Sequence, residues 1–317
     1  MRRPSSPVDP RPGSASVDAV QRFVFENEPV RGHFVRLHAA WRALREHRDY
    51  PAPVRTLLGE AASASVLLAA TLKFHGTLTL QLTGDGAVRL LVAQCTHDFR
   101  LRALARVDEE RIAQLPSAPD GPFRHLVGDR ARFAATIEAA ERDVRYQGIV
   151  PLEGGSLSAS LEAYFAASEQ LPTRVQLAAD GTQAAGLLVQ RLPASSAAQG
   201  GEGAETAWRD AERGVRHVEH SELLSQPLER VLVRHFGGRD VRLYAGSAVR
   251  FECRCGPARV AQVLRALGAG EVRDVLAEQG SVTVTCDFCS RPYRFDAIDV
   301  ERILAPGAVP EAPRSVQ

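Results

Sequence analysis

The chain has 317 residues, of which 44% are hydrophobic, and a formal net charge of +1 at pH 7. This length predicts more than one domain, and the near-zero net charge argues against a generally basic nucleic-acid-binding protein. No apolar run follows Met1, and the most apolar stretch, residues 66–72, is too short to cross a bilayer. We therefore expect a cytoplasmic protein without a membrane partner.

Residues 1–16 are rich in Pro, Ser and Arg and are expected to be a disordered tail. Residues 17–192 are expected to form one α+β domain in which sheet and helices are mixed. Strands are predicted where apolar and polar residues alternate, at 23–25, 29–37, 77–82, 88–94, 131–138, 144–150, 174–179 and 184–192. Helices are predicted at 41–47, 54–73 and 157–170, and residues 106–123 resemble a loop. The second half of the 54–73 helix carries only Ala, Ser, Thr, Val and Leu, which predicts burial on most sides.

Residues 193–240 are expected to form a flexible, marginally stable linker. Its start, residues 193–203, has the composition of a linker, and residues 200–239 carry much charge with helical patterns only at 220–224 and 228–236. The segment nevertheless contains apolar residues that would lie over the sheet of the first domain, braced by the module that follows: Val215, Val218, Leu223, Leu224, Leu228, Val231, Leu232 and Phe236.

Residues 241–305 contain four of the five cysteines and are expected to form a small metal-binding module. Cys253 and Cys255 make one pair, and Cys286 and Cys289 make the other after a spacer. Two thiol pairs joined by a folded spacer predict one tetrahedral zinc ion per chain, provided that the backbone bends between the first two thiols. Helices are predicted at 258–266, 271–278 and 297–304, and strands at 282–285 and 293–295. Residues 306–317 are expected to be a loose tail.

No pattern in the sequence indicates an enzyme. A closed four-thiolate site leaves no open position for a substrate, so we expect a structural or redox-responsive metal site. The fifth cysteine, Cys95, is interpreted as a small buried hydrophobic residue rather than a nucleophile.

Several motifs follow one another in a fixed order between residues 17 and 304. They are Phe25-Glu26-Asn27, Val30-Arg31-Gly32, Asp49-Tyr50-Pro51, the segment 67–74, the segment 81–86, Arg145-Tyr146-Gln147-Gly148, Tyr164-Phe165, the segment 168–174, and the cysteine pairs with Phe295, Ala297 and Asp299. In this order they resemble the heat shock protein 33 family, the redox-regulated holdase chaperones of bacteria. The N-terminal tail, the Gly/Ser/Ala-rich part of the linker and Cys95 depart from the family pattern.

The resemblance implies an ATP-independent chaperone that is inactive while reduced and bound to zinc. Oxidation would convert the four thiolates into two disulfides, release zinc, unfold the linker and allow the protein to hold unfolding client proteins. We expect the disulfides Cys253–Cys255 and Cys286–Cys289, because neighbours in sequence close the smallest loops. A homodimer of the oxidised form is compatible with this expectation.

Two other classes stay open at this point. A zinc-ribbon protein that binds nucleic acid would need a basic face, and the arginines of the module are interspersed with acidic residues. A thiol–disulfide oxidoreductase would favour one exposed thiol pair at a helix N-terminus rather than two metal-bound pairs. A salt-dependent shift on RNA would support the first class, and turnover of a disulfide with glutathione would support the second.

Overall fold

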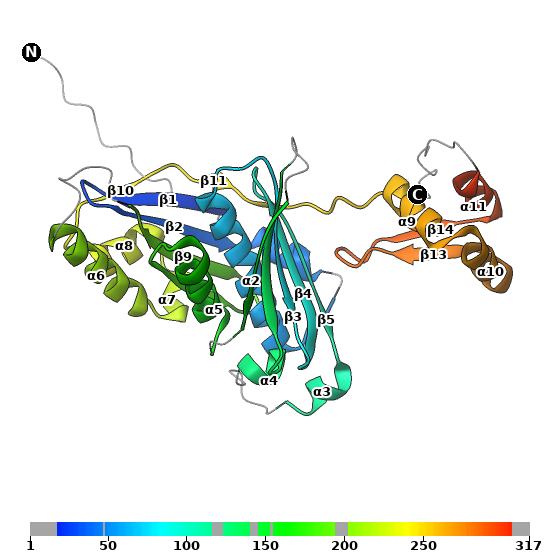
Figure 1. Cartoon of the computed structure of the whole chain (residues 1–317), viewed down its shortest axis with the longest axis horizontal. Helices are drawn as coiled ribbons and strands as arrows, with labels where there is room; N and C mark the ends of the chain where they lie inside the picture. The colour runs from blue at the N-terminus through cyan, green and yellow to red at the C-terminus, as the bar shows by residue number, and fades with distance from the viewer. Residues whose placement is uncertain are drawn as a thin grey trace, which may run out of the picture.

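A computed structural model describes residues 18–46, 48–115, 123–139, 145–152, 155–193 and 202–305 (Figure 1). The predictions for the two tails at 1–16 and 306–317, for residues 194–201 and for His47 lie outside these residues. Within them the chain forms two large sheets, a set of helices and a small separate sheet, so the predicted α+β class is confirmed. No helix among the described residues is long and apolar enough to span a membrane.

The first sheet is antiparallel and has the order β10-β1-β2-β9-β8, with β11 also pairing with β1. Its long strands are β1 (Ala19–Phe25), β2 (Val30–Leu37), β8 (Thr173–Ala179) and β9 (Ala184–Arg191), and its short strands are β10 (Val241–Leu243) and β11 (Ser247–Ala248). The long strands confirm the predicted alternating segments and the predicted hairpin between residues 174 and 192.

The second sheet has the order β12-β5-β4-β3-β6-β7. Its strands are β3 (Gly76–Thr83), β4 (Val88–Thr96), β5 (Arg100–Val107), β6 (Arg132–Ala139), β7 (Arg145–Pro151) and β12 (Arg250–Phe251). All pairs are antiparallel except β12 with β5. Strand β5 was not predicted. Arginines alternate with apolar residues over part of it, and its apolar side faces the core.

Helix α2 (Ala52–Thr71) lies between the two sheets and contacts strands of both (Figure 1). Residues 61–69 of this helix are all buried, which confirms the prediction from its apolar second half. Helix α1 (Ala39–Arg45) begins where the buried Asp18 carboxylate accepts hydrogen bonds from the amides of residues 38–40. This carboxylate caps the helix because the first amides of a helix have no partner within it.

A short helix, α3 (Glu109–Ala113), lies in the segment 106–123 that was predicted to be a loop, so the prediction was wrong for these residues. Residues 116–122 of that segment lie outside the described residues, and a second short helix, α4 (Phe123–Val127), begins at its last residue. Both helices have five residues, too few to show a helical period. Helix α5 (Leu157–Tyr164) starts at the Ser156 cap and continues as a π-helical turn, η1 (Phe165–Glu169), so the predicted helix at 157–170 is confirmed with a change of winding at its end.

The linker region forms three helices that pack on the first sheet, on the face opposite α2. They are α6 (Glu202–Arg216), α7 (His220–Ser225) and α8 (Leu228–Phe236). Their apolar side chains form one cluster with strand residues such as Phe23, Phe34 and Leu187. Packing of the linker on the sheet is thus confirmed. The expectation of little helix before residue 220 was wrong, because α6 presents a narrow stripe of Ala207, Trp208, Ala211 and Val215 to the sheet.

Residues 241–251, assigned to the metal module from the sequence, form a strap along both large sheets. The strap contains β10, β11 and β12, which pair with β1 and β5. After it come α9 (Pro257–Leu267), α10 (Ala269–Gln279), β13 (Val282–Thr285), β14 (Pro292–Phe295) and α11 (Ala297–Leu304), which match the predicted elements. These five elements share a small core of their own that includes Leu264, Phe295 and Val300.

Candidate metal centre and its surroundings

The four cysteines of the C-terminal module lie together. Their sulfur atoms are all within 4.8 Å of one another, and all four residues are half-buried. The Sγ atoms of Cys253 and Cys286 are 3.6 Å apart, and those of Cys255 and Cys289 are 3.4 Å apart. A tetrahedral zinc site with bonds of about 2.3 Å has sulfur–sulfur edges of about 3.8 Å. The cluster therefore fits a four-coordinate metal ion of that size.

Local backbone geometry turns each pair toward the cluster. Cys286 and Cys289 belong to the turn between β13 and β14, in which the amide of Ser290 donates to the carbonyl of Cys286 (2.8 Å) and the amide of Cys286 donates to the carbonyl of Arg291 (3.0 Å). Ser290 adopts a left-handed conformation that closes this turn. Residues 252–256 lie between β12 and α9 outside any helix or strand, as two thiols separated by one residue require in order to face one ion.

The thiols have different electrostatic surroundings. The Tyr293 hydroxyl donates a hydrogen bond to Cys255 Sγ (3.0 Å). Burial raises the pKa of Cys255, but this hydrogen bond and those of the neighbouring cysteines outweigh it and lower the pKa to about 7. Burial raises the pKa of Cys253 and also that of Cys289. Cys255 thus ionises more readily than Cys253 and Cys289 in the metal-free cluster.

The cysteine module contacts the second large sheet through the turn between β13 and β14. The carboxylate of Asp287 forms ion pairs with Arg106 and with Arg48, and the ring of Phe288 lies 4.1 Å from the Arg102 guanidinium carbon. From the first cysteine pair, Arg254 donates to the hydroxyl of Thr77 on β3 (3.0 Å). The module is therefore held at the β5 side of the molecule by polar contacts.

Cys95 takes no part in the cluster. It lies on β4, is fully buried in the main core, and its pKa is raised by that burial. The interpretation of Cys95 as a small hydrophobic residue agrees with this position.

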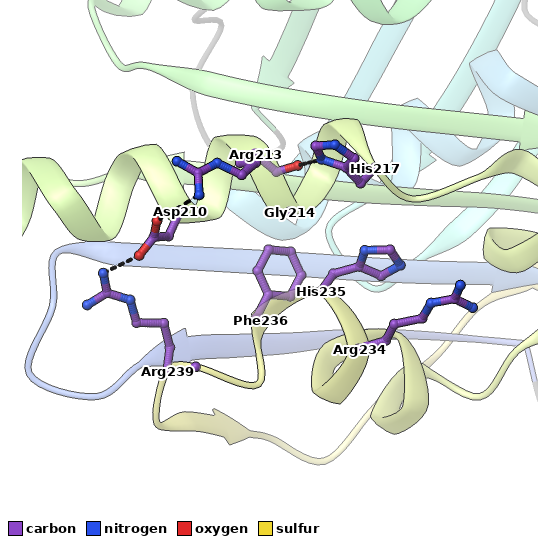
Figure 2. A pocket seen from close by; sticks show the side chains of 9 residues that line it. Asp210, Arg213, Gly214, His217, Arg234, His235, Phe236 and Arg239 are labelled. Carbon is purple, nitrogen blue, oxygen red and sulfur yellow. Dashed lines mark hydrogen bonds and ion pairs between the residues drawn. The ribbon is translucent and has the colours of Figure 1, made fainter.

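The linker helices are held to the first domain by ion pairs around their apolar cluster. Arg239 pairs with Asp210 of α6 and with Glu28 at 2.6 Å, and Arg174 of β8 pairs with Glu212 of α6. Between α6 and α8 lies a surface hollow of about 300 Å³ (Figure 2). Figure 2 shows Phe236 beside Gly214 at the crossing of the two helices, where an added methyl group would lie 2.3 Å from the ring.

The linker helices and the cysteine module lie at opposite ends of the molecule (Figure 1). The expected bracing of the linker by the module therefore has to act through an intermediate segment. The strap of residues 241–251 joins them, because it pairs with β1 beside the linker and with β5 beside the module. Sequence patterns predicted the cysteine cluster but not its partners, since Arg48, Arg102 and Tyr293 belong to no recognisable motif.

Comparisons with known proteins agree with this architecture. A family model described as Hsp33 protein matches residues 18–296. The 33 kDa chaperonin of Nitrosococcus oceani is 42% identical over 286 residues, which cover 90% of this chain and 94% of that protein. The 33 kDa chaperonin of Chromobacterium violaceum is 41% identical over 287 residues, which cover 90% and 93%. Both names are those of chaperones rather than enzymes, in agreement with the prediction that this chain is not an enzyme.

A solved structure has the same fold. The crystal structure of the heat shock protein 33 homologue from Thermotoga maritima superimposes with a TM-score of 0.75 over 90% of this chain and 98% of that one, at 22% sequence identity.

Proposed function

Since the chain belongs to the Hsp33 family, we propose that it is a redox-regulated, ATP-independent holdase chaperone of the cytoplasm. The observation that carries this proposal is the cluster of four cysteine sulfurs within 4.8 Å, in a module that contacts the main domain through a polar turn, Arg254 and a strap. The partners are unfolding proteins, which the oxidised form would bind through apolar surface and so protect from aggregation.

We propose that Cys253, Cys255, Cys286 and Cys289 hold one zinc ion per chain in the reduced protein. Bound zinc would keep the four sulfurs as thiolates at neutral pH, the form that oxidants attack. The module has only a small core around Leu264 and Phe295, so cross-linking of its two ends by the cysteines would supply much of its stability. Metal binding to such modules is worth on the order of 10 kcal/mol of folding free energy.

The proposed activation step is oxidation of the four thiolates to the disulfides Cys253–Cys255 and Cys286–Cys289. Each pair of thiolates gives up two electrons when its S–S bond forms, so each pair reduces one molecule of hydrogen peroxide to two of water, with two protons taken from solvent. Sulfur–sulfur distances of 3.6 and 3.4 Å join one pair to the other, but each proposed bridge closes a smaller loop. A bridge across one residue is also strained and easily reduced, which suits a reversible switch. Peptide mapping that found mainly Cys255–Cys286 bridges would contradict this pairing.

Once zinc no longer cross-links the module, the module would unfold and hold the strap less firmly, and the linker would be released. We propose the division into an α+β domain (17–192), a linker (193–240) and a redox module (241–305), with the strap as the part of the module that transmits its state. The linker helices cover Phe23, Phe34 and Leu187 of the first sheet, so their departure would expose apolar surface on both partners. Each released residue gains about 1–2 kcal/mol of conformational entropy.

One experiment tests the proposal. Zinc content and suppression of aggregation of a heat-denatured protein are measured before and after peroxide treatment. We expect one zinc per chain and no suppression in the reduced form, and zinc loss with suppression in the oxidised form. Retained zinc, or equal suppression in both forms, would overturn the proposal.

A salt-dependent RNA shift or turnover of a disulfide with glutathione would favour the alternative classes. Sedimentation of the oxidised form tests for a homodimer.

A further inference from the structure

The two residues between Cys286 and Cys289 occupy a defined site on the main domain. The Asp287 carboxylate is paired with Arg106 and lies 3.6 Å from Arg48, and the neighbouring Phe288 ring lies under Arg102. An acidic side chain and the aromatic side chain that follows it are thus each held by arginines of another domain. Metal binding by the cysteine sulfurs does not require either contact.

The arginines of this site are set in place by the main domain. Arg102 and Arg106 lie on the same side of β5, because side chains four residues apart in a strand point the same way. The Arg102 Nε donates to Gln94 Oε1 at 2.7 Å, which fixes its guanidinium over the sheet. Among the described residues, Arg48 and Arg106 form ion pairs with Asp287 and with no carboxylate of their own domain. Both arginines would therefore lose their ion-pair partner if the module moved away.

A groove of about 660 Å³ continues from the same two arginines. Arg48 and Arg106 line it together with Tyr50, Val107 and Ile112, and its volume is in the range of about 300–1,000 Å³ that is usual for binding pockets. The groove lies beside residues 105–107 at the C-terminal end of β5, whereas Arg100 and Leu101, which pair with β12, lie at the start of this strand. Asp49 and Glu109 also line the groove, so an apolar segment suits it better than an acidic one.

We propose that Arg48, Arg102, Arg106 and this groove form a binding site for an extended segment of an unfolding protein in which an acidic residue precedes an aromatic one. Asp287 and Phe288 occupy the site in the closed molecule as an internal mimic of that segment. Arginine–carboxylate pairs and the packing of an aromatic ring on a guanidinium supply the recognition. The groove lies beyond Arg106, away from Arg102, so apolar residues before the acidic one would enter it. This inference rests on the proposed chaperone function.

Two fluorescein-labelled Gly/Ser peptides test the site directly, one with a Leu-Ala-Asp-Phe sequence and one with Leu-Ala-Lys-Phe. Anisotropy is recorded with the full-length protein before and after peroxide oxidation. We expect oxidised protein to bind the Asp-Phe peptide on the order of ten-fold more tightly than the Lys-Phe peptide, and reduced protein to bind neither. Arg106→Glu should abolish the preference. Arg124→Glu, at an exposed arginine of α4 that is paired with Asp129, is the matched control and should keep the preference.

The internal mimic is tested in the reduced protein. Asp287→Arg should open the site and allow the Asp-Phe peptide to bind without oxidation, while Asp274→Arg on the exposed side of α10 should not. Combining Asp287→Arg with Arg106→Asp should close the site again, and zinc content is measured in each variant. Equal binding of both peptides by oxidised wild-type protein, or an unchanged preference in Arg106→Glu, overturns the inference. Either result leaves the proposed function intact if oxidation still suppresses aggregation, whereas failure of that suppression contradicts the function itself.

Discussion

Cys286 links the two halves of the cysteine cluster, because its sulfur lies 3.6 Å from Cys253 in the other pair. Replacing it with serine leaves three thiolates and a poor ligand for a soft tetrahedral site. We expect Cys286→Ser to lower the zinc content from about one ion per chain to near zero, measured by mass spectrometry of the native protein. Cys95→Ser is the control and should keep its zinc, since Cys95 is buried in the main core. Full zinc retention in Cys286→Ser would remove the four-cysteine site.

His33 makes the stability of the main domain depend on pH. Its ring is buried on β2, and burial, followed by the charges of Arg31 and Arg22, lowers its pKa from 6.5 to about 3. The unfolded chain therefore binds more protons below pH 6.5, and stability falls as the pH drops from there toward 3. We expect this residue to lower the free energy of unfolding by about 2 kcal/mol when the pH falls from about 7 to about 5.

Urea unfolding at the two pH values measures this effect. The loss of unfolding free energy between the two pH values should shrink by about that amount in His33→Gln. His217→Gln, at an exposed histidine just after α6, should leave this loss unchanged. An identical pH dependence in wild type and His33→Gln would show that His33 ionises alike in the folded and unfolded chains.

Secondary structure could be predicted wherever the apolar residues of a segment repeat with the period of a helix or a strand. Helix α2 and the five elements of the cysteine module were found from periodicity and turn residues alone. Helix α6 was missed because its apolar stripe is narrow and surrounded by charge, so only packing on the first sheet reveals it. Likewise, the cysteine spacing predicted the cluster, but the contact of Asp287 with Arg48 joins residues far apart in the chain and depends on the tertiary fold.

The crossing of α6 and α8 depends on Gly214. An added methyl group would lie 2.3 Å from the Phe236 ring and 2.9 Å from the carbonyl oxygen of His235. We expect Gly214→Ala to destabilise the linker packing by about 1–3 kcal/mol, although alanine favours the helix itself by about 1 kcal/mol. Limited proteolysis and hydrogen exchange of residues 202–236 in the reduced protein would report the loosening, and activation should then need less oxidant.

Gly203, in the first turn of the same helix, is the matched control. Among the described residues, no atom lies within 4 Å of a methyl group added there, so Gly203→Ala should leave the linker as protected as in the wild type or more so. Equal protection in both alanine variants would show that the helix crossing does not limit linker stability.

For the whole molecule, we expect oxidation to act at a distance. The cysteine cluster and the linker helices lie at opposite ends of the chain's fold, joined by the strap. Hydrogen exchange should therefore show lost protection on oxidation first in residues 241–251 and then in residues 215–236, with α2 unchanged. The measurement compares reduced and oxidised protein under the same conditions. If residues 215–236 stay equally protected in both forms while client binding begins, the linker is not the switch.

The strap has a further consequence once the cysteine module has left β5. Because residues 241–251 remain covalently attached, the released turn stays close to its former site at an effective concentration that is millimolar for short flexible tethers. A bound client segment therefore competes with a turn of the same chain rather than with a ligand free in solution. Restoring the reduced, metal-bound turn would displace a client of micromolar affinity without any change in client concentration, so lengthening the strap by inserted glycines and serines should slow client release.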